Sequence, residues 1–128
     1  MKKLLLFALL LLAASSSMAN YKNPKLPIEQ RVEDLISKMT LEEKVGQMNQ
    51  FCGVVHVSNM DKKAQADNQD AQGYYPGINA DTLRKWTKEG RIGSYLHVLT
   101  PEEANELQEL AMSSRLGIPL ILGIDAIH

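Results

Sequence analysis

Residues 117–128 read GIPLILGIDAIH, and this stretch decides the predicted fold. Gly117 and Pro119 end a preceding helix, because glycine adopts the left-handed conformation at helix ends and proline cannot continue a helix. The residues that follow, Leu120 to Ile124, are apolar without alternation. Such a run is typical of a parallel strand that is buried on both faces. We therefore expect a buried parallel strand that ends at Asp125.

A helix and a further strand precede this stretch. Residues 91–99 (RIGSYLHVL) favour a strand. The next residues, Thr100-Pro101-Glu102-Glu103, combine an N-cap threonine, a proline at the first helical position and a glutamate at the third. We expect that helix to run to about Arg115. Strand, helix and strand in this order predict an α/β fold with a parallel sheet.

The N-terminal half continues the same order of elements. An apolar stripe at Ile28, Val32, Leu35, Ile36 and Met39 predicts an amphipathic helix. Thr40 and Glu43 form a capping box, so a short helix begins at Leu41 and is weakened by Gly46. The β-branched, apolar segment 47–57 predicts one strand.

A long polar segment follows this strand. Residues 58–78 show no periodicity and predict a loop, of a length that is more often functional than idle. Tyr74 and Tyr75 lie in it, and they could stack on a sugar or anchor the loop; the anchor role is favoured. Asn79 then caps a helix over residues 80–89, which ends at Gly90.

The first 19 residues have the features of a secretory signal peptide. Lys2 and Lys3 precede an apolar run from Leu4 to Ala14, and Ser17-Met18-Ala19 provides small residues for cleavage before Asn20. As a helix the apolar run would rise only about 16 Å, against a hydrocarbon core of roughly 30 Å. We therefore expect an exported protein, periplasmic or secreted, whose domain covers residues 20–128 and which has no stable membrane insertion after cleavage.

Composition excludes some classes of function. The net charge of −1 becomes −3 without the two lysines of the signal peptide, and no basic run occurs, so nucleic acid is not an expected partner. The one cysteine, Cys52, cannot form a disulfide framework and is interpreted as a buried apolar residue. Stability must come from a hydrophobic core. Neither a phosphate-binding glycine loop nor a nucleophile elbow is present, and no cofactor is expected.

Asp125 is the candidate functional residue. It lies at the carboxyl end of a predicted parallel strand, where α/β proteins bind ligands, although a helix N-cap or a structural ion pair would also explain it. His128 and His97 could join it in a metal site, but their spacing does not support one, and no metal is expected. The acid pairs that end in Glu43 and Glu103 are explained by helix capping.

Two longer stretches resemble a known family. Residues 31–48 (RVEDLISKMTLEEKVGQM) and residues 114–128 (SRLGIPLILGIDAIH) are similar to the N-terminal signatures of family 3 glycoside hydrolases. The resemblance covers roughly residues 21–128, apart from segment 58–78. Where this chain has Asp125-Ala126, N-acetylglucosaminidases of the family tend to have Asp-Gln, and many xylosidases have Glu at the first position. The chain therefore resembles the β-glucosidase branch.

The resemblance implies a fold, an activity and a role for Asp125. It implies a retaining, exo-acting β-glucosidase that hydrolyses terminal β-D-glucosyl residues of oligosaccharides or glucosides. It implies an incomplete, N-terminal part of a (β/α)8 TIM-like barrel, in which Asp125 binds hydroxyls of the terminal sugar. The nucleophile and the acid/base of the family lie later in the chain. We therefore expect this fragment to be inactive by itself, with no catalytic residue among its own.

Other functions remain open. A β-xylosidase or β-N-acetylglucosaminidase of the same family would share the motifs, and a non-catalytic exported α/β binding module would share the fold. The sequence does not indicate an oligomeric state.

Overall fold

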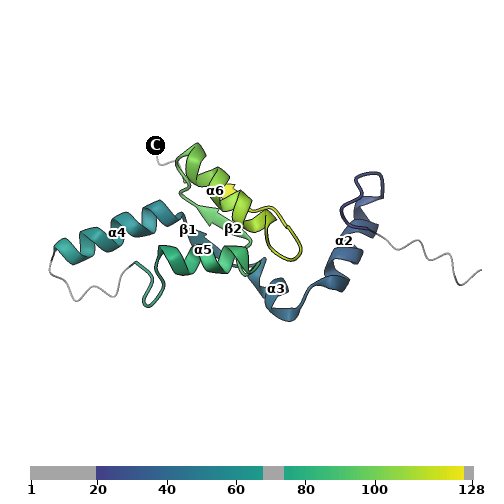
Figure 1. The fold of residues 1–128 in the computed structure, drawn as a ribbon, viewed down its shortest axis with the longest axis horizontal. Helices are drawn as coiled ribbons and strands as arrows, with labels where there is room; N and C mark the ends of the chain where they lie inside the picture. The colour runs from purple at the N-terminus through teal and green to yellow at the C-terminus, as the bar shows by residue number, and fades with distance from the viewer. Residues whose placement is uncertain (1–19, 68–73, 126–128) are drawn as a thin grey trace, which may run out of the picture. The chain divides into compact units, whose positions relative to one another are not determined.

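The computed structural model describes residues 20–67 and 74–125, and the chain divides into two compact units between Met39 and Thr40. The predicted signal peptide and His128 lie outside the described residues. The helices are α2 (Ile28–Lys38), α3 (Leu41–Gly46), α4 (Val54–Ala66), α5 (Ala80–Lys88) and α6 (Pro101–Met112), and the strands are β1 (Gln50–Cys52), β2 (Ser94–Leu96) and β3 (Ile121–Gly123) (Figure 1). None of these helices is long and apolar enough to cross a lipid bilayer.

The first unit contains α2 and the lead-in before it. The side chain of Asp34 links the lead-in to α2. Its carboxylate accepts a hydrogen bond from the Tyr21 amide at 2.8 Å and forms an ion pair with Lys38 at 2.6 Å. The predicted helix is confirmed. Its apolar stripe is not covered within the unit, since Ile28 is 69% exposed and Val32 is 46% exposed.

The second unit is built on a three-stranded parallel sheet in the order β1-β2-β3. Gln50 pairs with Ser94, and Ser94 pairs with Ile121. The α/β class and the parallel pairing predicted from residues 91–125 are confirmed.

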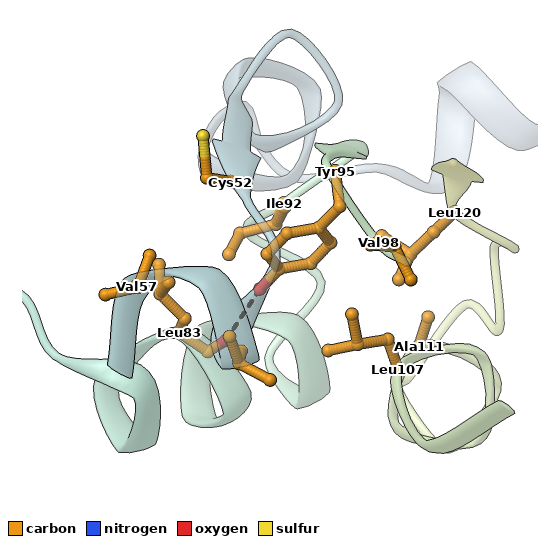
Figure 2. Close-up of a cluster of buried hydrophobic side chains, with 10 residues drawn as sticks. Cys52, Val57, Leu83, Ile92, Tyr95, Val98, Leu107, Ala111 and Leu120 are labelled. Carbon is orange, nitrogen blue, oxygen red and sulfur yellow. Dashed lines mark hydrogen bonds between the residues drawn. The ribbon is translucent and has the colours of Figure 1, made fainter. Parts of the chain in front are cut away.

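Tyr95 is the centre of the hydrophobic core of this unit. Its side chain is fully buried, and apolar residues of α4, α5 and α6 surround it (Figure 2). Its hydroxyl lies 2.8 Å from the Thr87 hydroxyl and donates to the Leu83 carbonyl at 3.3 Å. The core cluster consists of Cys52, Val54, Val57, Leu83, Ile92, Tyr95, Val98, Leu107, Ala111 and Leu120. The predicted apolar role of Cys52 is therefore confirmed.

Helix beginnings agree with the capping signals in the sequence. Thr40 accepts from the Glu43 amide and Glu43 accepts from the Thr40 amide, which is the predicted capping box. Asn79 caps α5, and Thr100 caps α6 with Pro101 in the first turn. These side chains satisfy amides that have no partner within their own helix.

The prediction for residues 47–78 is wrong in part. Within the expected strand 47–57, only Gln50–Cys52 form a strand, and the end of that segment and the first half of the expected loop form helix α4. The helix forms because Val54 and Val57 are buried in the core and a distant carboxylate accepts from its first turn. Tertiary contacts of this kind override the strand preference of β-branched residues.

The prediction that the last strand is buried on both faces is also not met in the described residues. Ile121 is 74% exposed, and β3 pairs only with β2, so it is the edge of this sheet.

Candidate functional site

The carboxyl ends of the three strands form one edge of the sheet. Backbone hydrogen bonds extend past the strands there: the Gly53 amide donates to the Leu96 carbonyl at 2.8 Å, and the His97 amide donates to the Gly123 carbonyl at 2.9 Å. The segments after β1, β2 and β3 are therefore held side by side. Ligands of α/β proteins bind at this edge.

Asp125 lies two residues beyond β3, at the position that the sequence predicts, and its side chain is exposed. An exposed carboxylate at this edge is available to a polar ligand. Its binding role stays a prediction. His128, the other candidate residue of this motif, lies outside the described residues.

His97 follows β2 and has an unusual backbone. Its φ of 60° makes it the one non-glycine residue with positive φ in the described ranges. The ring stacks on the ring of His56 from α4, with centroids 5.2 Å apart and planes inclined by 24°. Sequence reasoning placed His97 at a strand end but missed its pairing with His56, because α4 was not predicted.

The described residues contain no cluster of side chains that supports a metal site. In the described ranges, no group of three or more His, Cys, Asp or Glu side chains is arranged to hold a metal ion. The rings of His56 and His97 are nearly parallel, so their in-plane lone pairs do not converge on one point.

The tyrosines after the undescribed segment lie beside β1. The Tyr75 hydroxyl accepts from the Cys52 amide at 3.1 Å, and burial raises the pKa of Tyr75 to about 12. Tyr75 therefore anchors its segment, as favoured. Tyr74 is 41% exposed, its hydroxyl lies 3.7 Å from the Cys52 sulfur, and its ring meets His56 edge-on at 5.3 Å.

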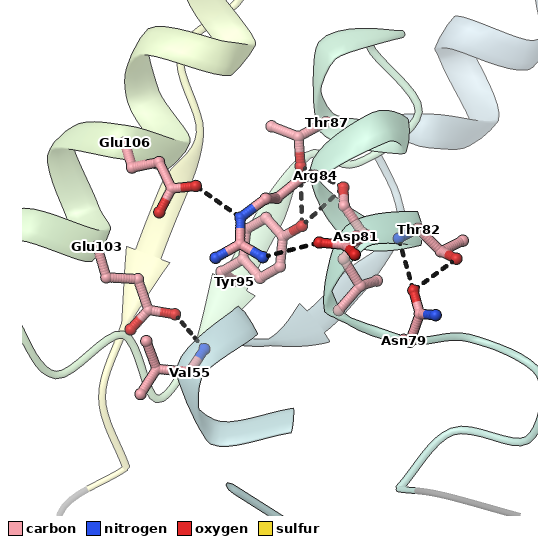
Figure 3. A network of polar contacts seen from close by, with 10 residues as sticks. Val55, Asn79, Asp81, Thr82, Arg84, Thr87, Tyr95, Glu103 and Glu106 are labelled. Atoms are coloured by element: carbon pink, nitrogen blue, oxygen red, sulfur yellow. Dashed lines mark hydrogen bonds and ion pairs between the residues drawn. The ribbon is translucent and has the colours of Figure 1, made fainter. Parts of the chain in front are cut away.

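Two glutamates in helix first turns contact other elements. Glu43 also caps its own helix, whereas the Glu103 carboxylate binds the first turn of α4 and does not cap α6, which corrects the capping role predicted for it. Glu103 is 3% exposed, and its carboxylate accepts from the Val55 amide at 2.9 Å, in the first turn of α4 (Figure 3). Glu43 accepts from Arg115 at 3.0 Å, and the Arg115 guanidinium holds the pKa of this carboxyl below its usual range. Both carboxylates are engaged in structural contacts.

A shallow pocket of about 110 Å³ opens between α4 and the segment after β2. His56 and His97 line it together with the polar side chains of Asn59 and Thr100. Apolar lining comes from residues that include Met60 and Leu99, which are 36% and 65% exposed. The pocket thus combines rings, hydrogen-bonding groups and apolar surface.

The chain is similar to curated β-glucosidases. It is 30% identical over 109 residues to "Probable beta-glucosidase C" of Aspergillus oryzae, a match that covers 84% of this chain and 16% of that protein. It is 32% identical over 112 residues to "Periplasmic beta-glucosidase/beta-xylosidase" of Dickeya chrysanthemi, which covers 82% of this chain and 15% of that protein. "Periplasmic beta-glucosidase" of Salmonella typhimurium is 28% identical over 98 residues, 76% of this chain and 10% of that protein. No family model matches the chain.

These similarities confirm the resemblance to β-glucosidases that residues 31–48 and 114–128 predict. The chain spans about a sixth, or less, of the length of these relatives.

Proposed function

Since the chain resembles β-glucosidases over most of its own length, we propose that it forms the N-terminal part of the catalytic barrel of a retaining, exo-acting β-glucosidase of glycoside hydrolase family 3. The observation that carries the proposal is the position of Asp125. Asp125, within the motif GIDAIH, lies two residues after β3 of a parallel sheet, and the carboxyl edge of the strands is where a β/α barrel binds substrate.

The proposed role of Asp125 is to hold hydroxyls of the terminal glucosyl residue. A carboxylate accepts two hydrogen bonds from vicinal hydroxyls, and bonds to a charged acceptor are about twice as strong as neutral ones. Substrates of this class are β-glucosides and short β-linked oligosaccharides.

Catalysis itself is assigned to the remaining length of the longer protein. A retaining glycosidase needs two carboxyl groups roughly 5–5.5 Å apart, one as nucleophile and one as acid/base. At the carboxyl edge, Asp125 is exposed, whereas Glu103 is buried against the Val55 amide. Among the described residues of this edge, one free carboxylate does not make this pair, so we expect residues 20–128 alone to hydrolyse no aryl β-glucoside.

Export is part of the proposal. The matched proteins of Salmonella and Dickeya are named periplasmic, and residues 1–19 have the pattern of a signal peptide. N-terminal sequencing of the exported protein should begin at Asn20.

The decisive experiment is Asp125→Asn in the full-length protein, assayed with an aryl β-glucoside. The variant keeps the shape of the side chain and loses its charge. We expect kcat/KM to fall about a hundredfold, which corresponds to roughly 2.7 kcal/mol of lost transition-state binding. Asp67→Asn, an exposed carboxylate at the end of α4, is the matched control and should change nothing. Equal rates for Asp125→Asn and wild type would remove Asp125 from the site.

A β-xylosidase is the second candidate, because the matched Dickeya protein is named for both activities. A panel of aryl β-glucoside, β-xyloside and β-N-acetylglucosaminide, tested on the full-length protein, separates the candidates.

A further inference from the structure

Helix α4 is an addition to the connection between β1 and β2. Neighbouring parallel strands are usually joined by one crossover helix, and α5 serves as this helix, with Leu83 and Thr87 buried against the sheet. Helix α4 comes before it and begins directly after β1, at the carboxyl edge of the sheet. Its two buried residues, Val54 and Val57, both belong to its first turn. The attachment of α4 to the sheet is therefore concentrated at the start of the helix.

The start of α4 is packed against the segment after β2 and against α6. A Cβ at Gly53, the N-cap of α4, would lie 2.8 Å from Glu103 Oε1 and 2.9 Å from the His97 carbonyl oxygen. Glu103 Oε1 also accepts from the Val55 amide at 2.9 Å (Figure 3). The ring of His56 stacks on the ring of His97, with centroids 5.2 Å apart. A buried carboxylate and a pair of imidazole rings thus hold this turn in place.

Of the two rings, that of His97 belongs to a segment that is bonded to the sheet. The His97 amide donates to the Gly123 carbonyl at 2.9 Å. Its φ of 60° is a conformation that a residue with a side chain keeps where its surroundings impose it. His56 lies on α4, whose N-cap glycine makes no side-chain hydrogen bond. Repulsion between the rings would therefore displace α4 rather than the sheet.

The charge of this histidine pair depends on pH, because histidine is the side chain that gains a proton between about pH 8 and 5. Neutral rings stack, whereas two imidazolium ions at this distance repel each other. Among the described residues that line the pocket between α4 and the segment after β2, Glu103 is the one with a carboxylate, and it can balance one imidazolium. Tyr74 meets His56 edge-on at 5.3 Å and stays neutral, because its contact with Cys52 raises its pKa.

The charged groups of the neighbouring elements have partners of their own or face solvent. They are Asp61, Lys62 and Lys63 on α4, Asp81 and Arg84 on α5, Glu106 on α6 and Asp125 after β3. Arg84 forms ion pairs with Asp81 and Glu106, and Asp61 accepts from the Tyr74 amide at 2.8 Å. The two lysines and Asp125 are exposed, where water and salt screen their charges. The second imidazolium of the pair thus lacks a carboxylate to balance it among the described residues that line the pocket.

We propose that the His56–His97 pair is a pH-sensitive contact, which holds the start of α4 against the sheet at neutral pH and releases it when both rings are protonated. Release opens the pocket between α4 and the segment after β2. The proposal follows from contacts within this chain and does not depend on the proposed function.

The experiment is hydrogen exchange with mass spectrometry on the full-length protein, at about pH 7.5 and about pH 5.5, with rates corrected for the intrinsic effect of pH on exchange. Peptides that cover residues 53–66 should lose protection about tenfold at the lower pH, because of the repulsion between the two charged rings. Peptides that cover residues 101–112, in α6, are the internal control and should change less than about twofold.

Three variants assign the response to the histidines. His56→Phe keeps a ring on α4 that cannot be charged, so it should remain protected at the higher pH and lose about twofold or less at the lower pH. His97→Asn removes the other ring but tolerates the left-handed conformation, and it should lower protection equally at both pH values. Glu103→Gln keeps an acceptor for the Val55 amide and cannot titrate, so the acid response should persist or increase.

Three outcomes would overturn the proposal. The first is equal exchange of residues 53–66 at both pH values in the wild-type protein. The second is an acid response in His56→Phe as large as that of the wild type. The third is loss of the response in Glu103→Gln, which would assign it to the carboxylate of α6 instead of the rings.

Discussion

Glu103 provides the sharpest test of how the second unit is held together. Its buried carboxylate accepts from the Val55 amide at 2.9 Å, although the two residues are 48 positions apart. The N-cap of α4 is Gly53, which has no side chain for this purpose. The first turn of α4 therefore depends on a carboxylate that α6 supplies.

Glu103→Ala should loosen α4 locally. It leaves a part-buried amide without its acceptor, which costs about 1–3 kcal/mol, and it removes a negative charge from the helix N-terminus. We take about 2 kcal/mol as the sum, which lowers the protection of the α4 amides about thirtyfold. Hydrogen exchange with mass spectrometry, on peptides that cover residues 53–66 of the full-length protein, measures this change directly.

Two companion variants make the test specific. Glu103→Gln keeps a carbonyl acceptor and should lose about 1 kcal/mol or less. Glu102→Ala is the matched control, since Glu102 lies in the same helical turn but is exposed. Equal exchange for Glu102→Ala and Glu103→Ala would show that α4 does not depend on the carboxylate of Glu103.

Three further perturbations follow from contacts in the second unit. Burial raises the pKa of Tyr95 from 10.0 to about 12, so stability should fall as pH rises from about 10 through 12; Tyr95→Phe should cost about 1 kcal/mol at neutral pH and reduce this alkaline loss in denaturant unfolding, while the share that comes from Tyr75, whose pKa is also raised to about 12, should persist. Glu43 has a lowered pKa because of Arg115, so its contribution is present above about pH 4.5 and is lost as pH falls through the lowered value; Arg115→Ala should flatten this acid limb in thermal unfolding. A Cβ at Gly93 would lie 2.3 Å from a backbone oxygen, whereas one at Gly123 would meet a side-chain carbon at 3.5 Å, so Gly93→Ala should abolish soluble expression and Gly123→Ala should not.

Elements with a local signal in the sequence were predicted correctly. Thr40, Asn79 and Thr100 each cap the helix that follows, because a cap is a contact between residues three positions apart. The parallel sheet followed from the order of strands and helices, and the position of Asp125 followed from the apolar run before it.

Helix α4 was not predicted, because its sequence carries no local signal for a helix. Its start contains Val54, Val55 and Val57, which favour strands, and its N-cap glycine gives no capping signal. The interaction that stabilises this start comes from Glu103, far along the chain. The contact between the rings of His56 and His97 could not be predicted from the sequence for the same reason, because His56 lies on this helix.

The pairing of the strands also bears on the order in which the second unit assembles. Joining β2 to β3 brings residue 94 to residue 121, whereas joining β1 to β2 must bring residue 50 to residue 94. Closing the longer segment costs about 0.4 kcal/mol more chain entropy, and its described residues include helices α4 and α5, whereas the shorter segment includes α6. Sheet formation should therefore nucleate at β2–α6–β3, with β1 added afterwards. During synthesis β3 emerges after β1 and β2 but is needed to begin the sheet, so these two strands remain unpaired until β3 has been made.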